Sequence, residues 1–275
     1  MRKKILFERD PLFVFLRTRS TYASIGNKLV LVMKIIQLNI WGGKLGKQII
    51  EILQKETPDL VCFQEVIVFP AGKEGDLFFS TLEKFKQAGD FAHSFFSPVF
   101  GFSYMKQKAD FGNAILSMHP FQETKAVFTR KEYIDDQEML DGDFNIRNLQ
   151  HVTLKVGGEN LNVLNHHGHH LHEHKNGDVE TVRQCKIIAD YVQALQGKTV
   201  LCGDFNLAPE SSSLSELNML LVNQCIRTKV STTRTSLTHK AEVCDYIFTS
   251  SNIEVKRFDV LTDIASDHKA LVLEF

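Results

Sequence analysis

Short apolar runs recur along most of the chain, and they constrain its fold more than any other feature. Most are rich in β-branched and aromatic residues and have the length of a β-strand. We expect strands over Lys34–Leu38, Leu60–Phe63, Asn113–Leu116, Leu149–Val156, Leu161–Asn165, Thr199–Cys202, Val243–Phe248, Glu254–Val260 and Ala270–Phe275.

Amphipathic helical patterns are fewer than these runs. Residues Lys44–Gln54 and Val179–Leu195 place apolar side chains at helical spacing, and Phe78–Phe85 is a shorter candidate. Many strands with few helices between them predict two packed sheets flanked by helices. The polar side chains of interest fall where the predicted strands end, which is where a scaffold usually presents its chemistry.

The 275 residues are 43% hydrophobic and 24% charged, which fits one large domain with a sizeable core. We expect residues 33–275 to form this single domain. Residues 1–32 hold seven Lys or Arg against two Asp or Glu, with no apolar run long enough to span a bilayer. We expect them to be a basic leader that is flexible or dispensable; a peripheral membrane contact is the alternative.

The rest of the chain is mildly acidic, holding 25 of the 32 basic and 31 of the 33 acidic residues. Such a body does not fit a protein that grips long nucleic acid by phosphate neutralisation alone. The five cysteines are scattered, without a CxxC pair. This pattern favours a reducing compartment, and we expect the cytoplasm.

Two polar side chains of interest lie at the ends of the first two predicted strands. Asn39 ends the first strand in LNIWGG, and Glu65 ends the second in CFQEV. A carboxylate beside so apolar a strand needs a partner, and a hard divalent cation is one such partner. For Glu65 alone, a side chain that simply reaches solvent is the plainer interpretation.

Two later strand ends bring further polar side chains. VLNHHG ends with His167, and GDFN carries Asp204 and Asn206. Residues at positions i and i+2 of an extended segment point to the same side, so the carboxylate and the carboxamide converge. An Asx-turn is the alternative explanation for the second motif.

Near the C-terminus, VCDYIF holds Asp245 among apolar neighbours, and Asp267 and His268 precede the last strand. Asp245 and His268 are candidates for an orienting pair, in which the carboxylate fixes the imidazole tautomer. The alternatives are a core hydrogen bond for Asp245 and a solvated turn for the SDH segment.

The ordered set LN, QE, N-x-H, GDFN, DYI and SDH resembles the endonuclease/exonuclease/phosphatase superfamily, which includes DNase I and exonuclease III-type enzymes. The resemblance runs from Met33 to Phe275. It implies an α/β (α+β) fold of DNase I type: a four-layer α/β/β/α sandwich whose two mixed sheets are mostly antiparallel.

The same resemblance implies a catalytic domain that hydrolyses phosphate esters by in-line attack of water. The cofactor would be Mg²⁺, with Mn²⁺ as a substitute. Asn39, Glu65 and Asp267 would serve the metal, and Asn113 and Arg147 would contact the substrate. The catalytic residues would be His167, Asp204, Asn206, Asp245 and His268.

The substrate stays open at this point: a nucleic-acid end, a phospholipid head group and a small phosphorylated molecule all fit. Nuclease, sphingomyelinase-like and inositol-phosphatase-like activities are therefore alternatives. A non-catalytic phosphate- or nucleic-acid-binding module on the same fold is a further alternative. No stable protein partner is implied, and we expect a monomer.

Three segments are not explained by the matched motifs, apart from His167 in the first of them. Residues 166–174 contain six histidines, which a His-rich surface loop explains and which an accessory metal or phosphate contact would also explain. Phe91–Phe102 is an aromatic connector that we expect in the core, with a lipid-facing loop or a base-stacking platform as alternatives. The acidic segment Tyr133–Asp143 would repel a long polyanion beside the site.

Overall fold

The computed structural model describes residues 21–25, 28–70, 82–104, 106–137 and 143–275. The chain divides into two units, Met1–Val32 and Met33–Phe275. In the first unit, β1 (Thr21–Ile25) and β2 (Lys28–Val32) pair as an antiparallel hairpin, which the sequence did not predict. Whether this unit is dispensable stays a prediction.

The second unit is built on two six-stranded sheets. The first sheet has the order β13 (Arg257–Val260), β14 (Leu271–Glu274), β3 (Lys34–Asn39), β4 (Leu60–Val68), β6 (Gln107–Ser117) and β5 (His93–Tyr104). The second has the order β11 (Val222–Asn223), β12 (Asp245–Thr249), β10 (Lys198–Asp204), β9 (Glu159–His167), β8 (Arg147–Val156) and β7 (Glu123–Arg130).

Each sheet contains one parallel pair among antiparallel neighbours: β3 with β4, and β9 with β10. Parallel neighbours end at the same edge of a sheet. In the register, Asn39 lies opposite Gln64, and His167 lies opposite Asp204. The strand ends that carry the predicted site residues therefore meet in pairs.

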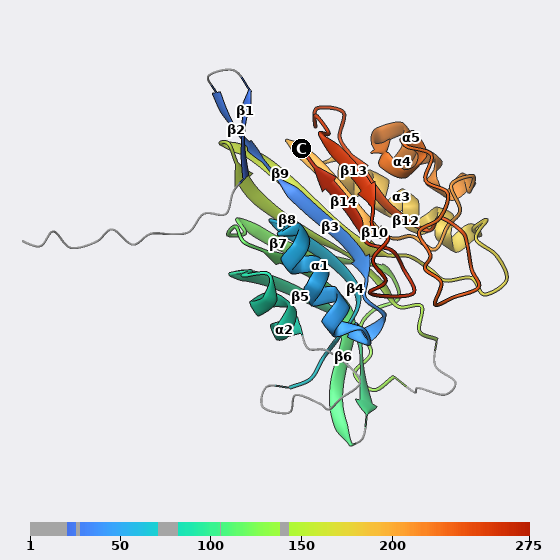
Figure 1. Cartoon of the computed structure of the whole chain (residues 1–275). Helices are drawn as coiled ribbons and strands as arrows, with labels where there is room; N and C mark the ends of the chain where they lie inside the picture. The colour runs from blue at the N-terminus through green and yellow to red at the C-terminus, as the bar shows by residue number, and fades with distance from the viewer. Residues whose placement is uncertain (1–20, 26–27, 71–81, 105, 138–142) are drawn as a thin grey trace, which may run out of the picture. The chain divides into compact units, whose positions relative to one another are not determined.

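Helices cover the outer faces of both sheets (Figure 1). α1 (Gly46–Glu56) and α2 (Leu82–Ala88) pack on the first sheet, where Ile49, Leu53 and Phe85 join its buried apolar cluster. α3 (Val179–Gln193), α4 (Ser215–Leu220) and α5 (Gln224–Arg227) lie over the second. The predicted four-layer sandwich with mixed sheets is confirmed.

The described helices include none that is long and apolar enough to cross a membrane. All five cysteines are free and buried. Cys62 in β4 and Cys202 in β10 are fully buried, as the apolar runs around them predict.

The nine predicted strands and two longer helices are present, with ends shifted by a few residues. The third predicted helix, Phe78–Phe85, lies partly outside the described residues; α2 begins at Leu82. One prediction was wrong: Phe91–Phe102 is no connector, because most of it forms β5. This strand is at an edge of its sheet, where Pro98 is tolerated beside a register shift.

A buried network of side-chain amides joins the two sheets. Gln64 on β4 donates to Asn165 Oδ1 on β9 at 2.7 Å, and Asn165 donates to Gln150 Oε1 on β8 at 2.9 Å. Gln37 on β3 donates to Gln64 Oε1 at 2.9 Å and to Asp245 Oδ1 on β12 at 3.2 Å. Buried amides satisfy their hydrogen bonds in few relative positions, so this network specifies how the sheets align.

Candidate active site

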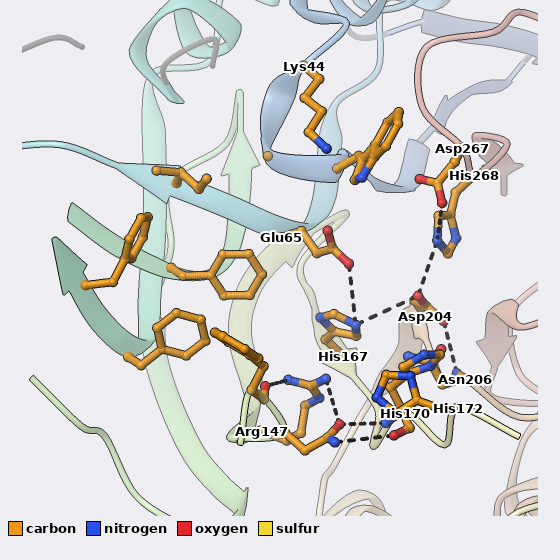
Figure 2. Close-up of a pocket in the computed structure, with 18 of the residues that line it drawn as sticks. Lys44, Glu65, Arg147, His167, His170, His172, Asp204, Asn206, Asp267 and His268 are labelled. Carbon is orange, nitrogen blue, oxygen red and sulfur yellow. Dashed lines mark hydrogen bonds and ion pairs between the residues drawn. The ribbon is translucent and has the colours of Figure 1, made fainter. Parts of the chain in front are cut away.

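A cavity of about 660 Å³ lies where these strand ends meet (Figure 2). Seven of the ten predicted site residues line it: Glu65, Arg147, His167, Asp204, Asn206, Asp267 and His268. Asn39 and Asp245 are buried and hydrogen-bonded to residues of the lining. Asn113 is not among the lining residues.

Two glycines allow β9 and β10 to end close together. A Cβ on Gly203 would lie 2.1 Å from the carbonyl oxygen of His166, and one on Gly168 would lie 2.3 Å from that of Phe205. Larger residues would push the strand ends apart. With glycine at both positions, His167 Nε2 lies 3.8 Å from Asp204 Oδ2.

Asp204 is at the centre of the site. Its Oδ1 accepts from the Asn206 backbone at 3.0 Å, and its Oδ2 accepts from Asn39 Nδ2 at 3.1 Å. Burial alone would raise the pKa of Asp204, but the neighbouring cationic groups, above all His268, hold it well below its usual value. Asp204 is therefore an ionised carboxylate that faces the cavity as a proton acceptor.

Asp245 lies directly behind His268. His268 Nδ1 is 2.9 Å from Asp245 Oδ2, and its Nε2 is 3.6 Å from Asp204 Oδ2. Burial lowers the pKa of His268, but the carboxylates of Asp245 and Asp204 outweigh it and raise the pKa well above its usual value. The structure thus brings together the two residues predicted as an orienting pair.

Glu65 enters the cavity from an irregular point of β4. The pairing with β6 shifts between Phe63 and Val66, and Glu65 has a φ of 56°. This bulge turns its carboxylate toward the cavity. Burial raises the pKa of Glu65, and repulsion from Asp204 and Asp267 adds to the increase.

Asn39 holds Glu65 and Asp204 together. Its Nδ2 donates to Glu65 Oε1 at 3.0 Å and to Asp204 Oδ2 at 3.1 Å, while its Oδ1 accepts from the Trp41 backbone at 3.1 Å. The amide thus turns its donors, not its oxygen, toward the carboxylates. Metal ligation by Asn39 stays a prediction that requires this amide to rotate.

His167 lies between the same two carboxylates, with Nε2 3.9 Å from Glu65 Oε1. Burial lowers the pKa of His167 well below its usual value, and Arg147 lowers it further. The imidazole is therefore neutral in this state and suited to donating a single hydrogen bond. Its use as a general acid stays a prediction.

Asn206 is held by a lysine that we did not assign to the site. Lys175 Nζ, which is buried, donates to Asn206 Oδ1 at 2.7 Å and lies 2.8 Å from His170 Nδ1. This fixes Asn206 with its Nδ2 3.4 Å from the Gly168 carbonyl oxygen. Lys175 ends a polar, His-rich segment, where no sequence signal distinguishes a buried lysine from a solvated one.

Arg147 donates most of its hydrogen bonds to backbone carbonyl groups. Nε donates to Gly168 O at 2.6 Å, Nη1 to the carbonyls of Phe144 and Ile146, and Nη2 to Asn145 Oδ1 at 3.1 Å. A guanidinium has five donors, so one remains for a ligand. Arg147 thus positions two segments of the cavity wall, and substrate contact by it stays a prediction.

Asn113 lies between the sheets. It is buried, and its Nδ2 donates to Asn148 Oδ1 at 3.0 Å. The structure does not bring it to the other site residues. The aromatic position two residues earlier, Phe111, lines the cavity instead.

Arg234 also lines the cavity, although the sequence did not predict it as a site residue. It is buried, its Nη1 lies 3.4 Å from Asp267 Oδ2 and contacts His268 Nε2, and its Nε has no partner among the described residues. A guanidinium and an imidazole of raised pKa thus face one another. An anion bound beside this pair would accept hydrogen bonds from both groups and relieve their repulsion. The flanking TTRTS segment has no periodicity that reveals this.

The donor set fits a hard divalent cation. Glu65 and Asp267 present their carboxylates to the cavity. Among the described residues, the only Lys, Arg or His side chain within 4 Å of the Glu65 carboxylate is that of His167, which is neutral. Oxygen ligands of this kind suit Mg²⁺ or Mn²⁺. A second group of candidate ligands consists of the buried residues Asp204, Cys244, Asp245 and His268, of which Asp204 and His268 line the cavity. Burial raises the pKa of Cys244 to about 11, so it is a thiol and a poor ligand.

The His-rich stretch separates into distinct environments. His166 is buried with Nδ1 3.0 Å from Asn148 O, and burial lowers its pKa to about 4. His170 and His172 line the cavity, with ring centroids 4.8 Å apart, whereas His174 is exposed. Within the described chain, this stretch contributes no group of three or more candidate metal ligands. It is therefore part cavity wall and part surface.

A family model described as the Endonuclease/Exonuclease/phosphatase family matches residues 36–268. This range includes every candidate site residue. A search of curated proteins returned no match.

Solved structures share the fold. An endonuclease/exonuclease/phosphatase from Beutenbergia cavernae aligns over 88% of this chain and 71% of its own, with a TM-score of 0.67 and 18% identity. A mannosyl-6-phosphatase of Bacteroides thetaiotaomicron aligns over 88% of this chain and 98% of its own, with a TM-score of 0.62 and 17% identity. D. rerio TDP2, complexed with single-strand DNA product, aligns over 88% of this chain and 98% of its own, with a TM-score of 0.63 and 14% identity.

Proposed function

Because the chain belongs to the endonuclease/exonuclease/phosphatase family, we propose that it is a divalent-metal-dependent hydrolase of phosphate esters. One observation carries this proposal. An ionised, buried carboxylate, Asp204, lies in the same cavity as two converging cationic donors, Arg234 and His268. A base beside an anion-binding pair is what attack of water on a phosphate requires.

The phosphate would bind beside Arg234 and His268, on the cavity side of this pair, with Asn206 Nδ2 as a further donor. Asp204 Oδ2 would accept the proton of the attacking water, and Asn39 Nδ2 would keep that carboxylate oriented. Asp245 would hold the His268 ring through Nδ1. The bond from phosphorus to the alcohol oxygen then breaks, and His167 is placed to donate a hydrogen bond to a phosphoryl or leaving oxygen.

Glu65 and Asp267 would hold the cation, with Mg²⁺ preferred and Mn²⁺ as a substitute. When bound, such a cation neutralises charge on the phosphoryl oxygens and on the leaving alkoxide. The five free, buried cysteines favour a reducing compartment, and we propose the cytoplasm.

The decisive variant is Asp204→Asn, which keeps the shape of the side chain and removes the proton acceptor. We expect turnover of an aryl phosphodiester and an aryl phosphomonoester to fall about 10³-fold or more without loss of folding. Asp263→Asn is the matched control, because Asp263 pairs only with Lys55 at the surface in the described chain. Near-normal turnover in Asp204→Asn would reject the assignment.

Metal removal tests the cofactor separately. EDTA should abolish turnover, and Mg²⁺ or Mn²⁺ in excess should restore it, because the donors are carboxylate oxygens. Full activity after exhaustive chelation would show that the protein needs no cation.

A further inference from the structure

One side of the cavity consists of apolar, mostly aromatic side chains that the proposed hydrolysis does not use. We call this group the aromatic wall: Ile67, Phe100, Phe102, Tyr104, Phe111 and Phe144. Figure 2 shows aromatic rings gathered on the side of the cavity away from Asp267 and His268. The charged residues and the aromatic wall thus face the same space from different sides.

Strand register builds the aromatic wall next to Glu65. Ile67, two residues after Glu65 on β4, lies opposite Phe111 on β6, and Phe111 lies opposite Phe100 on β5. The rings of Phe100 and Phe111 stack with centroids 4.9 Å apart and an interplanar angle of 10°. A continuous row of apolar groups therefore runs across three strands away from Glu65.

The row turns along β5, whose alternate residues point to one face. Phe102 follows Phe100, with ring centroids 6.1 Å apart, and Tyr104 continues the alternation. In Figure 1 the far ends of β5 and β6 extend beyond the body of their sheet. Phe100 and Phe102 belong to a buried apolar cluster at this end, and the partly buried Phe111 and Tyr104 pack against it beside the cavity.

Phe144 completes the aromatic wall from the opposite side. Its ring packs edge-on against Phe100 with centroids 5.8 Å apart, yet 36% of the residue is exposed. Arg147 Nη1 holds its backbone carbonyl at 2.6 Å, and Arg147 Nε holds Gly168 beside the catalytic strand ends. A single guanidinium thus ties Phe144 to the segment that follows His167.

Charge near the aromatic wall disfavours a second phosphate there. Asp143 lines the cavity next to Phe144, and it pairs with Arg130 at 3.0 Å and with Lys131 at 2.8 Å. Of these three residues, only Asp143 lines the cavity, so its carboxylate would repel a second phosphate there. The cavity fits a ligand with one charged end and one uncharged, apolar end.

We propose that the aromatic wall binds a planar aromatic group on the alcohol side of the substrate, so that the preferred substrates are phosphate esters carrying one aromatic ring close to the phosphate. This inference rests on the proposed hydrolytic function. Aromatic rings favour an aromatic partner over an aliphatic one of similar size, because edge-to-face and offset-stacked contacts add to the burial of apolar area. A nucleobase and a simple aryl group share this chemistry.

Three esters with alkyl leaving groups test the proposal without changing the leaving-group chemistry: benzyl, cyclohexylmethyl and ethyl phosphate, each as monoester and as methyl diester. We expect kcat/KM for benzyl to exceed that for cyclohexylmethyl about three- to tenfold, with ethyl lowest. Equal values for benzyl and ethyl, or for benzyl and cyclohexylmethyl, would overturn it. A nucleoside ester compared with its ribose ester then distinguishes a nucleobase from a simple aryl group.

Phe144→Ala should lower the benzyl-to-ethyl ratio about tenfold. Phe121→Ala is the matched control, because Phe121 packs on His93 and does not line the cavity; it should leave the ratio unchanged. An unchanged ratio in Phe144→Ala would remove Phe144 from the ring site.

Calorimetric binding of benzylphosphonate and ethylphosphonate separates this inference from the proposed function. If no ester is hydrolysed but benzylphosphonate binds more tightly, and Phe144→Ala removes the difference, the hydrolytic function fails and the aromatic site stands. If ethyl esters are hydrolysed without any benzyl preference in rate or binding, the function stands and the aromatic site fails.

Discussion

Three residues of the candidate site hold left-handed backbone conformations: Trp41, Glu65 and Asn206, with φ of 51°, 56° and 56°. Of these residue types only Asn adopts such a conformation readily. Strained positions of this kind cluster at functional sites, where they aim a side chain that a regular strand would turn elsewhere. The sequence predicts Glu65 and Asn206 as polar residues at strand ends but does not predict their backbone conformation, because the bulge at Glu65 depends on the pairing of β4 with β6.

Arg234 is the residue whose loss should matter most among those that the sequence did not reveal. Arg234→Ala should lower kcat/KM about 10²-fold and weaken inhibition by inorganic phosphate, because one of two facing anion donors is removed. Arg234→Lys should recover only part of the loss, since an ammonium lacks the planar fork. Steady-state kinetics with phosphate as inhibitor measures both effects.

The matched control is Arg227→Ala, because Arg227 is exposed at the end of α5. It should behave as the unchanged protein. Unaltered phosphate inhibition in Arg234→Ala would show that Arg234 only positions Asp267 and His268.

At the scale of elements, the sequence predicted strands best where β-branched runs were short and bounded by turns. Among the longer strands of the second unit it missed β5 and β7, for different reasons. Ser, Gly and Pro98 interrupt the alternation of β5, and its identity as a strand depends on β6 beside it. β7 is an edge strand with a largely exposed first half, so its pattern lacks apolar contrast.

The candidate site was predictable as a set of strand ends, because parallel pairs bring their ends to one edge. The two buried cationic side chains of the site were not predictable from the sequence. Lys175 and Arg234 lie in polar loops, and only the folded arrangement reveals that carboxylates and amides of the site surround them.

The His-rich stretch, residues 166–174, should contain both positions that affect turnover and positions that do not. His170→Ala should reduce turnover about fivefold, because it removes a contact that helps to hold Lys175 and Asn206, and one such hydrogen bond contributes about 1 kcal/mol. His174→Ala, at an exposed position, should have no effect. Turnover with Mg²⁺ measures both effects. Equal turnover of the two variants would show that His170 contributes no more to activity than an exposed residue of the same stretch.

At the scale of the whole molecule, residues 33–275 contain both six-stranded sheets and all candidate site residues. A chain that starts at Met33 should therefore fold and retain turnover. Thermal unfolding followed by circular dichroism, together with turnover, compares it with the full chain. Failure of the shorter chain to fold would contradict a dispensable leader.

Because the leader is basic, binding to anionic lipid vesicles is an independent test of its function. If the full chain binds vesicles of anionic lipid and the Met33-start chain does not, the leader is a peripheral membrane contact. Equal behaviour of the two chains toward vesicles would exclude that function.

The amide network aligns two sheets that each supply only part of the candidate site. Glu65 and Asn39 belong to the first sheet, whereas His167, Asp204 and Asp245 belong to the second. Neither sheet carries a complete set, so either sheet alone would be inactive, and activity would begin only once the two sheets had packed together. Gln64 and Asn165 lie on that packing surface. Turnover would therefore be a measure of how well the two sheets are aligned.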